Sequence, residues 1–193
     1  MESGATDGDL LAAYASGDAR AFAELYERHE RAVYRFFLRQ GASTSLADDL
    51  LQETWLAVVR NAANFEPRAK FTTWLYTIAR SKMIDHWRAR DDAISLAYFA
   101  GDAANDADDA VLDIAGSDAQ RPDHQVMARA EARAFLQAVE ALPPAQREAF
   151  LLQAEGGLSL EEIAAATGAA HETVKSRLRY AMSKLRLAME AWQ

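Results

Sequence analysis

Residues 158–186, LSLEEIAAATGAAHETVKSRLRYAMSKLR, contain the pattern that decides the fold of the C-terminal part of the chain. Ser159 and Glu162 have the spacing of a capping box, in which each side chain binds the other residue's backbone N–H at a helix start. Gly168 can close this short helix, because glycine adopts the left-handed backbone conformation without a Cβ clash. The stretch therefore predicts a short helix, a tight glycine turn and a second helix from about His171.

The second predicted helix is amphipathic and basic. Its apolar stripe repeats at helical spacing and comprises Val174, Leu178, Met182 or Ala181, and Leu185. Five cations stand at other positions, against the single carboxylate of Glu172: Lys175, Arg177, Arg179, Lys184 and Arg186. Two helices joined by a glycine turn, the second of them basic, form the arrangement that places a helix in the major groove of DNA. A basic helix that is merely solvated is the competing interpretation, which the capping box, the turn and the phased stripe together disfavour.

The charge of the chain is unevenly distributed. The formal net charge at pH 7 is −8, and residues 91–123 account for all of it with nine aspartates and one arginine. Residues 1–90 carry 12 cations and 12 carboxylates, and residues 124–193 carry 8 of each, so both parts balance to zero. The acidic segment has few large apolar residues and repels itself, which predicts an extended linker. The negative net charge of the whole chain therefore does not argue against a nucleic-acid partner.

The composition excludes several classes of site. The chain contains no cysteine, so neither a disulfide framework nor a thiolate metal site can form. No stretch approaches the ~20 continuous apolar residues of a membrane span. The opening residues MESGATDGDLL lack the basic and apolar regions of a signal peptide. The four histidines are scattered, and motifs for phosphate loops or nucleophilic catalysis are absent. We therefore expect a cytoplasmic protein that is not an enzyme, with no membrane association, metal or cofactor.

Helical periodicity dominates the rest of the chain, without a convincing strand pattern or internal repeat. The expected caps and ends in the N-terminal part are Asp18 and Gly41 for one helix, Ser45 and Asn61 for the next, and Thr72 and Arg90 for a third. In the C-terminal part, one helix precedes Pro143 and another covers residues 146–155. We expect an all-α protein with two small helical domains, residues 8–90 and 124–193, joined by the acidic linker 91–123.

A second pattern that is typical of nucleic-acid binding lies between residues 65 and 90. Aromatic residues alternate there with cations: Phe65, Phe71, Trp74, Tyr76 and Trp87 with Arg68, Lys70, Arg80, Lys82, Arg88 and Arg90. Aromatic rings beside cations suit single-stranded nucleic acid, because unstacked bases need a stacking partner and phosphates need neutralising. The competing interpretation is an ordinary core, since Trp74, Leu75 and Ile78 have the spacing of an inward face. We expect part of the aromatic set to be buried and part exposed.

These motifs together resemble the extracytoplasmic-function (ECF) group of bacterial RNA polymerase sigma factors, relatives of sigma-70. Residues 47–60, ADDLLQETWLAVVR, are similar to region 2.2, and residues 71–88, FTTWLYTIARSKMIDHWR, are similar to regions 2.3 and 2.4. Residues 142–152, LPPAQREAFLL, and the opening stretch resemble region 4. The resemblance covers residues 8–90 and 124–190. It implies a sigma region 2 helical bundle followed by a region 4 helix-turn-helix.

The resemblance also implies partners and residues for this chain. It implies binding to the β′ clamp helices of core RNA polymerase through the acidic and amide strip of Asp49, Gln52 and Glu53, which share a helical face. It implies reading and melting of the promoter −10 element by Lys70, Phe71, Trp74, Arg80, Ser81, Lys82 and Arg88. It implies reading of the −35 element by His171, Thr173, Lys175, Ser176, Arg177 and Arg179, with a further contact to the polymerase β flap. Ser81 stands where family members often have asparagine.

Family members are commonly held inactive by an anti-sigma protein, so an anti-sigma factor is a further expected partner. Two other functions are kept as alternatives. A stand-alone helix-turn-helix transcriptional regulator would carry a receiver or ligand pocket before residue 120, and the sequence shows neither. A sigma mimic that only sequesters an anti-sigma factor would have lost its DNA-facing cations. The chain retains Lys70, Arg80, Lys82, Lys175 and Arg177.

Overall fold

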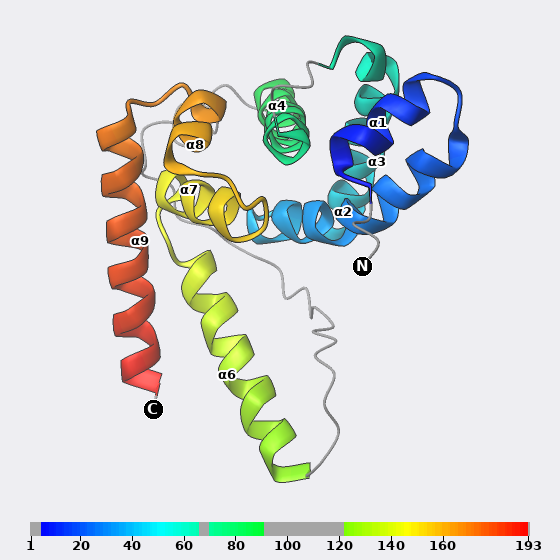
Figure 1. The fold of residues 1–193 in the computed structure, drawn as a ribbon. Coiled ribbons are helices and arrows are strands. Elements are labelled where there is room, and N and C mark those ends of the chain that lie inside the picture. The colour runs from blue at the N-terminus through cyan, green and yellow to red at the C-terminus, as the bar shows by residue number, and fades with distance from the viewer. Residues whose placement is uncertain (1–4, 66–69, 91–121, 193) are drawn as a thin grey trace.

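The computed structural model describes residues 5–65, 70–90 and 122–192. Within these three ranges all regular structure is helical, which confirms the predicted all-α class. The helices form two groups (Figure 1). The acidic linker predicted over residues 91–123 lies outside the described residues except for its last two positions, which already belong to the helix that follows.

The N-terminal group is built around the long helix α2. Its elements are α1 (Asp7–Ala15), α2 (Ala19–Arg39), α3 (Thr44–Asn61), the 3-10 turn η1 (Ala62–Asn64) and α4 (Phe71–Arg90). The core contains large rings from three of these helices. Phe36 of α2 meets Tyr76 of α4 edge to face with ring centroids 5.3 Å apart. Phe22 of α2 meets Trp55 of α3 in the same way at 5.7 Å. Such ring contacts contribute stability beyond that given by the buried area of the rings.

Two of the three predicted caps in this group are misplaced. Asp18 caps α2 as expected, with its carboxylate accepting from the Arg20 N–H at 2.9 Å. Helix α3 is capped by Ser43 and not by Ser45, because Ser43 is the residue whose backbone is extended and whose hydroxyl accepts from the Leu46 N–H. Helix α4 starts before Thr72, since its first backbone bond runs from the Trp74 N–H to the Lys70 carbonyl.

The C-terminal group contains the predicted helix-turn-helix. Its elements are α6 (Pro122–Glu140), α7 (Pro144–Ala154), α8 (Leu160–Thr167) and α9 (His171–Trp192). Helix α7 begins two residues before the expected residue 146, because Pro144 occupies the first turn, where its missing N–H would bond to nothing anyway. In Figure 1, α6 and α9 lie beside one another and extend away from the rest of the molecule.

The two groups pack against one another and share one hydrophobic core. Helix α4 contacts α8, and α2 contacts α6 and α7, as Figure 1 shows for these segments. One tight contact joins Tyr76 to the turn after α7. A Cβ placed on Gly156 would lie 3.0 Å from the Tyr76 ring, 2.6 Å from Leu158 Cδ1 and 2.7 Å from the Leu152 carbonyl oxygen. Only glycine therefore fits at position 156, because a Cβ there would clash with its neighbours.

The Gly156→Ala variant should lower the free energy of unfolding by about 1–3 kcal/mol, the usual cost of forcing an extra methyl group into packed surroundings. Gly8→Ala is the matched control, because a Cβ at Gly8 would meet its nearest atom at an ordinary 3.8 Å inside helix α1. Alanine there should raise stability by roughly 0.5–1 kcal/mol. Urea unfolding followed by circular dichroism measures both, and equal stabilities for the two variants would contradict the crowding at position 156.

Candidate nucleic-acid interface

The helix-turn-helix is held by local bonds at both ends of α8. The Ser159 hydroxyl accepts from the Glu162 N–H at 3.2 Å, and the Glu162 carboxylate accepts from the Ser159 N–H at 2.7 Å. Gly168 then ends the helix with φ 69°, in the left-handed region that glycine adopts freely. Both predicted features are confirmed. The cap holds the start of α8, and the turn at Gly168 sets the direction in which α9 leaves α8.

Helix α9 buries one stripe against α6, α7 and α8. The buried residues are Val174, Leu178, Ala181 and Leu185. The sequence left Met182 and Ala181 as alternatives, and Ala181 is the buried one, because Met182 is 49% exposed. With 100° between successive residues, Ala181 lies on the same side as Val174 and Leu185. The opposite side of α9 is thereby left for a partner.

The side of α9 directly opposite the core carries Ser176 and Arg179, as 3.6 residues per turn requires. Arg179 is exposed, and its guanidinium lies 5.0 Å from the centre of the Tyr180 ring. Lys175 flanks this face on one side and Arg177 on the other. Lys175 makes a weak ion pair with Glu172 at 3.4 Å, and both side chains are mostly exposed.

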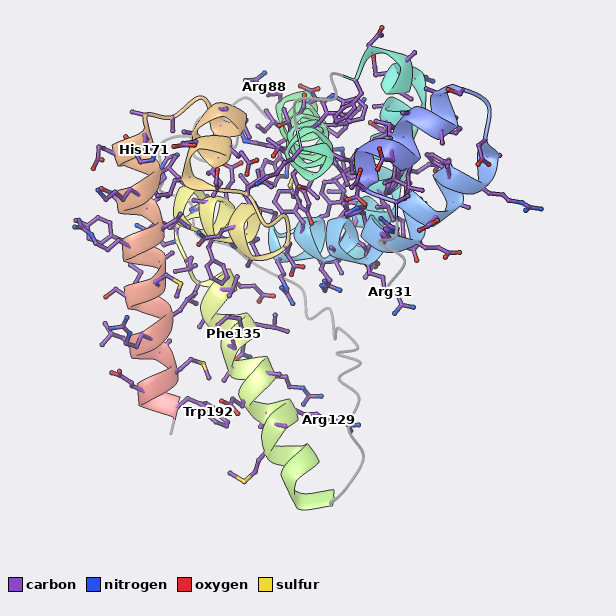
Figure 2. The ribbon with its side chains drawn as sticks, viewed as in Figure 1. Arg31, Arg88, Arg129, Phe135, His171 and Trp192 are labelled. Carbon is purple, nitrogen blue, oxygen red and sulfur yellow. The ribbon has the colours of Figure 1, made fainter. Side chains whose placement is uncertain are left out.

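The first turn of α9 completes the face. His171 and Thr173 are exposed there, and Figure 2 shows His171 at the start of the helix. The six residues predicted to read the −35 element thus all lie in the first three turns of α9, where four are exposed and Ser176 and Arg177 are partly exposed. A helix of this kind enters the major groove with its N-terminal residues toward the base edges.

Four of the seven residues predicted for the −10 element share one face of α4. Lys70, Trp74, Ser81 and Arg88 lie within about 40° of one another around the helix axis. Ser81 and Arg88 are exposed, and Arg88 is labelled near the end of α4 in Figure 2. Trp74 is half-buried beside Phe65, with ring centroids 5.2 Å apart. The Trp74 ring is therefore partly packed and partly exposed to solvent.

The remaining three of these seven residues have other surroundings. Phe71 is only 3% exposed and lies against the His29 ring, so its role here is in the core and no base can stack on it in this arrangement. Arg80 faces the C-terminal domain, where its Nε donates to Glu148 at 2.8 Å. Lys82 lies on a third side of α4 and reaches Glu53 of α3 at 3.6 Å. The seven residues therefore do not form one continuous surface.

The predicted polymerase-binding strip lies exposed along α3. Asp49, Gln52 and Glu53 all face solvent on one side of the helix. Leu56 lies on the same side and is 44% exposed, a large apolar residue at the end of the acidic and amide strip. Sequence reasoning missed Leu56, although its spacing from Gln52 and Glu53 carries the signal. An exposed leucine surrounded by polar groups is typical of a contact site for another protein.

Glu162 has a perturbed carboxyl group. The Ser159 N–H lowers the pKa of Glu162, and hydrogen bonds from Lys70 and Thr73 lower it further, while burial acts in the opposite direction. Lys70 Nζ lies 3.2 Å from the carboxylate. This residue thus belongs to the helix cap and also contacts the other domain.

Metal-binding and membrane-spanning features are both absent from the described residues. Across the described ranges, no group of three or more histidine and carboxylate side chains could hold a metal ion. Among the same residues, no helix is both long and apolar enough to cross a membrane.

The capped turn and the cationic face of α9 define a helix-turn-helix protein of the DNA-binding class. The family model for Sigma-70 region 2 matches residues 25–93, and the model for Sigma-70, region 4 matches residues 132–185. The RNA polymerase sigma factor NccH of Alcaligenes xylosoxydans xylosoxydans is 32% identical over 193 residues, 100% of each chain. The ECF RNA polymerase sigma factor SigK of Mycobacterium bovis is 31% identical, over 94% of this chain and 92% of SigK.

A solved structure agrees with these sequence likenesses. The sigma factor CnrH, of Cupriavidus metallidurans, in complex with the cytosolic domain of CnrY superposes with a TM-score of 0.63 and 26% identity. The match covers 96% of this chain and 97% of that one. The chain belongs to the ECF group of the sigma-70 family of RNA polymerase sigma factors, and it directs RNA polymerase in transcription initiation. No likeness favours the stand-alone regulator or the sigma mimic.

The Glu162→Gln variant should lower the free energy of unfolding at neutral pH by about 1 kcal/mol, since a charged acceptor is replaced by a neutral one. Because the folded pKa is lowered, the carboxylate contributes fully above its ordinary value of 4.5 and loses that contribution as the pH falls through the folded value. The difference between variant and parent should therefore shrink below pH 4.5. Urea unfolding at several pH values measures it, with the exposed neighbour Glu161→Gln as control. A difference that does not change with pH would contradict the assignment.

Proposed function

We propose that this sigma factor reads the −35 element with α9, opens and reads the −10 element with α4, and binds the β′ clamp helices of core polymerase with α3. In this division, residues 8–90 form region 2, residues 91–123 form the linker and residues 124–193 form region 4. The observation that carries the proposal is the exposed side of α9, where Ser176 and Arg179 lie opposite the buried stripe between two flanking cations.

The two kinds of residue on α9 support two kinds of DNA contact. Lys175 and Arg177 lie at the sides of the face, where a helix in the major groove approaches the phosphates. Ser176 and Arg179 lie at its centre, where side chains reach base edges. Arginine can bind guanine with two hydrogen bonds, and serine can bond to any base. We therefore assign affinity mainly to the flanks and sequence preference mainly to the centre.

The exposed face of α4 supports contact with a separated DNA strand. Lys70 and Arg88 supply charge at its two ends, and Trp74 and Ser81 lie between them. The exposed part of the tryptophan ring beside cations can stack with an unstacked base, at about 1–3 kcal/mol per base. Ser81 supplies one short hydroxyl, which makes fewer bonds to a base than an amide side chain can. Phe71 supports this face from below as a core residue.

The partners follow from the same assignment. Asp49, Gln52, Glu53 and Leu56 form the proposed surface for the clamp helices, and α6 to α9 supply the contact to the β flap. CnrH was solved with the cytosolic domain of CnrY, and we propose that a protein of the anti-sigma class binds this chain in a similar way. We place the protein in the cytoplasm, where core polymerase and promoter DNA are found. The polymerase carries out the chemistry, so this chain needs no catalytic residue, cofactor or metal.

Alanine substitution at Lys175 and at Arg179 should have different effects on promoter binding by the reconstituted holoenzyme. Lys175→Ala removes a phosphate contact, so it should weaken binding to all promoters alike and reduce the log–log salt slope by about one unit. Arg179→Ala should instead change the preference at one −35 position, by roughly 1–3 kcal/mol. Filter binding across salt concentrations and a set of −35 variants measures both effects. Lys184→Ala, about two turns beyond Arg177 toward the C-terminal end of α9, is the control, and equal behaviour of all three variants would refute the assignment.

Changes on the exposed face of α4 should impair strand opening more than closed-complex formation. Trp74→Leu keeps an apolar side chain against Phe65 but removes the stacking surface, and Ser81→Ala removes one hydroxyl. Permanganate footprinting should show less single-stranded −10 DNA for both variants. Run-off transcription should recover on templates whose −10 region is already unpaired. Ser45→Ala in the first turn of α3 is the control. A defect that persists on the unpaired templates would argue against a melting role.

A further inference from the structure

Tyr180 is a large aromatic residue on the outer side of α9, and its side chain is 52% exposed. It lies in the middle of the helix, next to a residue that we assign to base reading. The guanidinium carbon of Arg179 lies 5.0 Å from the centre of the Tyr180 ring. A cation at this distance is attracted by the electrons of the ring face. The ring therefore contacts the charged group that would meet the DNA.

This contact determines where the Arg179 guanidinium lies on the surface of the helix. Adjacent residues leave an α-helix about 100° apart, and their side chains do not ordinarily face one another. The side chains of Arg179 and Tyr180 must therefore incline toward each other, to a direction between the two. Ser176 lies in that direction, since it is three residues before Arg179 and four before Tyr180. The charged end of Arg179 is thus drawn toward Ser176, on the side opposite the buried stripe.

The charge of Arg179 remains available to a partner. Among the residues that the structure describes, no carboxylate pairs with Arg179. The acidic residue of the first turn, Glu172, lies instead 3.4 Å from Lys175 Nζ and 3.8 Å from His171 Nδ1. The aromatic ring therefore orients the guanidinium without neutralising it.

A guanidinium that stacks on an aromatic ring keeps its hydrogen-bonding edge free. Its N–H donors lie in the plane of the group, whereas stacking uses the flat face. Guanine offers two acceptors in the major groove, O6 and N7, which match two of these donors. An arginine that is already held in one place also loses less conformational freedom when it binds. The ring contact therefore favours two-bond recognition of guanine.

We propose that Tyr180 is a positioning residue that holds Arg179 for two-bond reading of a guanine in the −35 element. This role rests on the proposed reading of that element by α9. Tyr180 acts through Arg179 and not through the phosphates, so it contributes to base preference and not to the salt dependence of binding. A ring–cation contact at an exposed site is modest, and the expected contribution to base preference is about two- to fivefold.

Reconstituted holoenzyme tests this role on promoters in which each −35 position carries each of the four bases in turn. The parent should prefer guanine at one position, and Arg179→Ala should abolish that preference. Tyr180→Leu should reduce it about two- to fivefold and leave the log–log salt slope unchanged, since no phosphate contact is lost. Tyr180→Phe keeps the ring and should behave like the parent. Leu187→Ala, an exposed residue about two turns further along α9, is the control and should leave the base preference unchanged.

The double variant distinguishes positioning from a direct contact between Tyr180 and DNA. In the Arg179→Ala background, Tyr180→Leu should cause no further loss of guanine preference, because no guanidinium is left to hold. Equal losses in both backgrounds would overturn the positioning role. A Tyr180→Phe variant as impaired as Tyr180→Leu would also overturn it, since the effect would then belong to the hydroxyl. The same holds if Tyr180→Leu retains the full preference of the parent.

Nuclear magnetic resonance measures the contact without DNA. In the free chain, the Cδ protons of Arg179 should be shifted upfield by the ring current of Tyr180. Tyr180→Leu should remove this shift and Tyr180→Phe should keep it. A parent chain without the shift would overturn the positioning role even while α9 reads the −35 element. If instead the shift is present and Arg179→Ala leaves every −35 preference unchanged, the proposed function of Arg179 fails, and the role of the contact in base reading fails with it.

Discussion

The two bonds of one carboxylate connect the local and the global structure of this sigma factor. Glu162 accepts from the Ser159 N–H and so starts α8, and the same carboxylate lies 3.2 Å from Lys70 of the other domain. The first bond caps the start of α8, whose other end at Gly168 leads into α9. The second joins the start of α8 to the residue that precedes α4. If this side chain pointed elsewhere, α8 would lose its N-terminal cap and the two domains would lose one of their ion pairs.

Each of the two functional helices, α4 and α9, has one side packed in the core and another side available to a partner. Helix α9 commits four residues to the core and leaves the opposite side to Ser176 and Arg179. Helix α4 divides its surface three ways, between core, solvent and the other domain. Arg80 belongs to the third part and Ser81 to the second, although they are adjacent in sequence. Neighbouring residues can therefore have entirely different partners, and a motif read as a continuous string does not reveal this.

Features that depend on a few adjacent residues could be predicted from the sequence. The capping box of Ser159 and the left-handed turn at Gly168 need no knowledge of the rest of the chain. The cap of α3 was harder, because hydroxyl residues stand at positions 43, 44 and 45. The backbone leaving Gly41 decides which of them is extended. The start of α4 likewise depends on the position of Phe71, whose ring packs in the core against His29.

Features that depend on distant residues could not be predicted. Arg80 was assigned to DNA from its place in an aromatic and basic motif, and its partner Glu148 is 68 residues away in the chain. Nothing local in either sequence indicates that pairing. Leu56 is an intermediate case, since helical spacing places it among Asp49, Gln52 and Glu53. The prediction considered only the charged and amide residues on this side of α3, so it did not include the apolar Leu56.

The one-sided charge of the domain boundary has a consequence for how such proteins can recombine. Each ion pair described across that boundary takes its carboxylate from the C-terminal domain and its cation from the N-terminal domain. A hybrid that joined this helix-turn-helix domain to a region 2 without counterparts of Arg35, Arg39 and Arg80 would remove the ion pairs that Glu155 and Glu148 make across the boundary. The two halves therefore constitute a matched set, and exchange of promoter-reading domains between relatives would have to carry its complementary charges along.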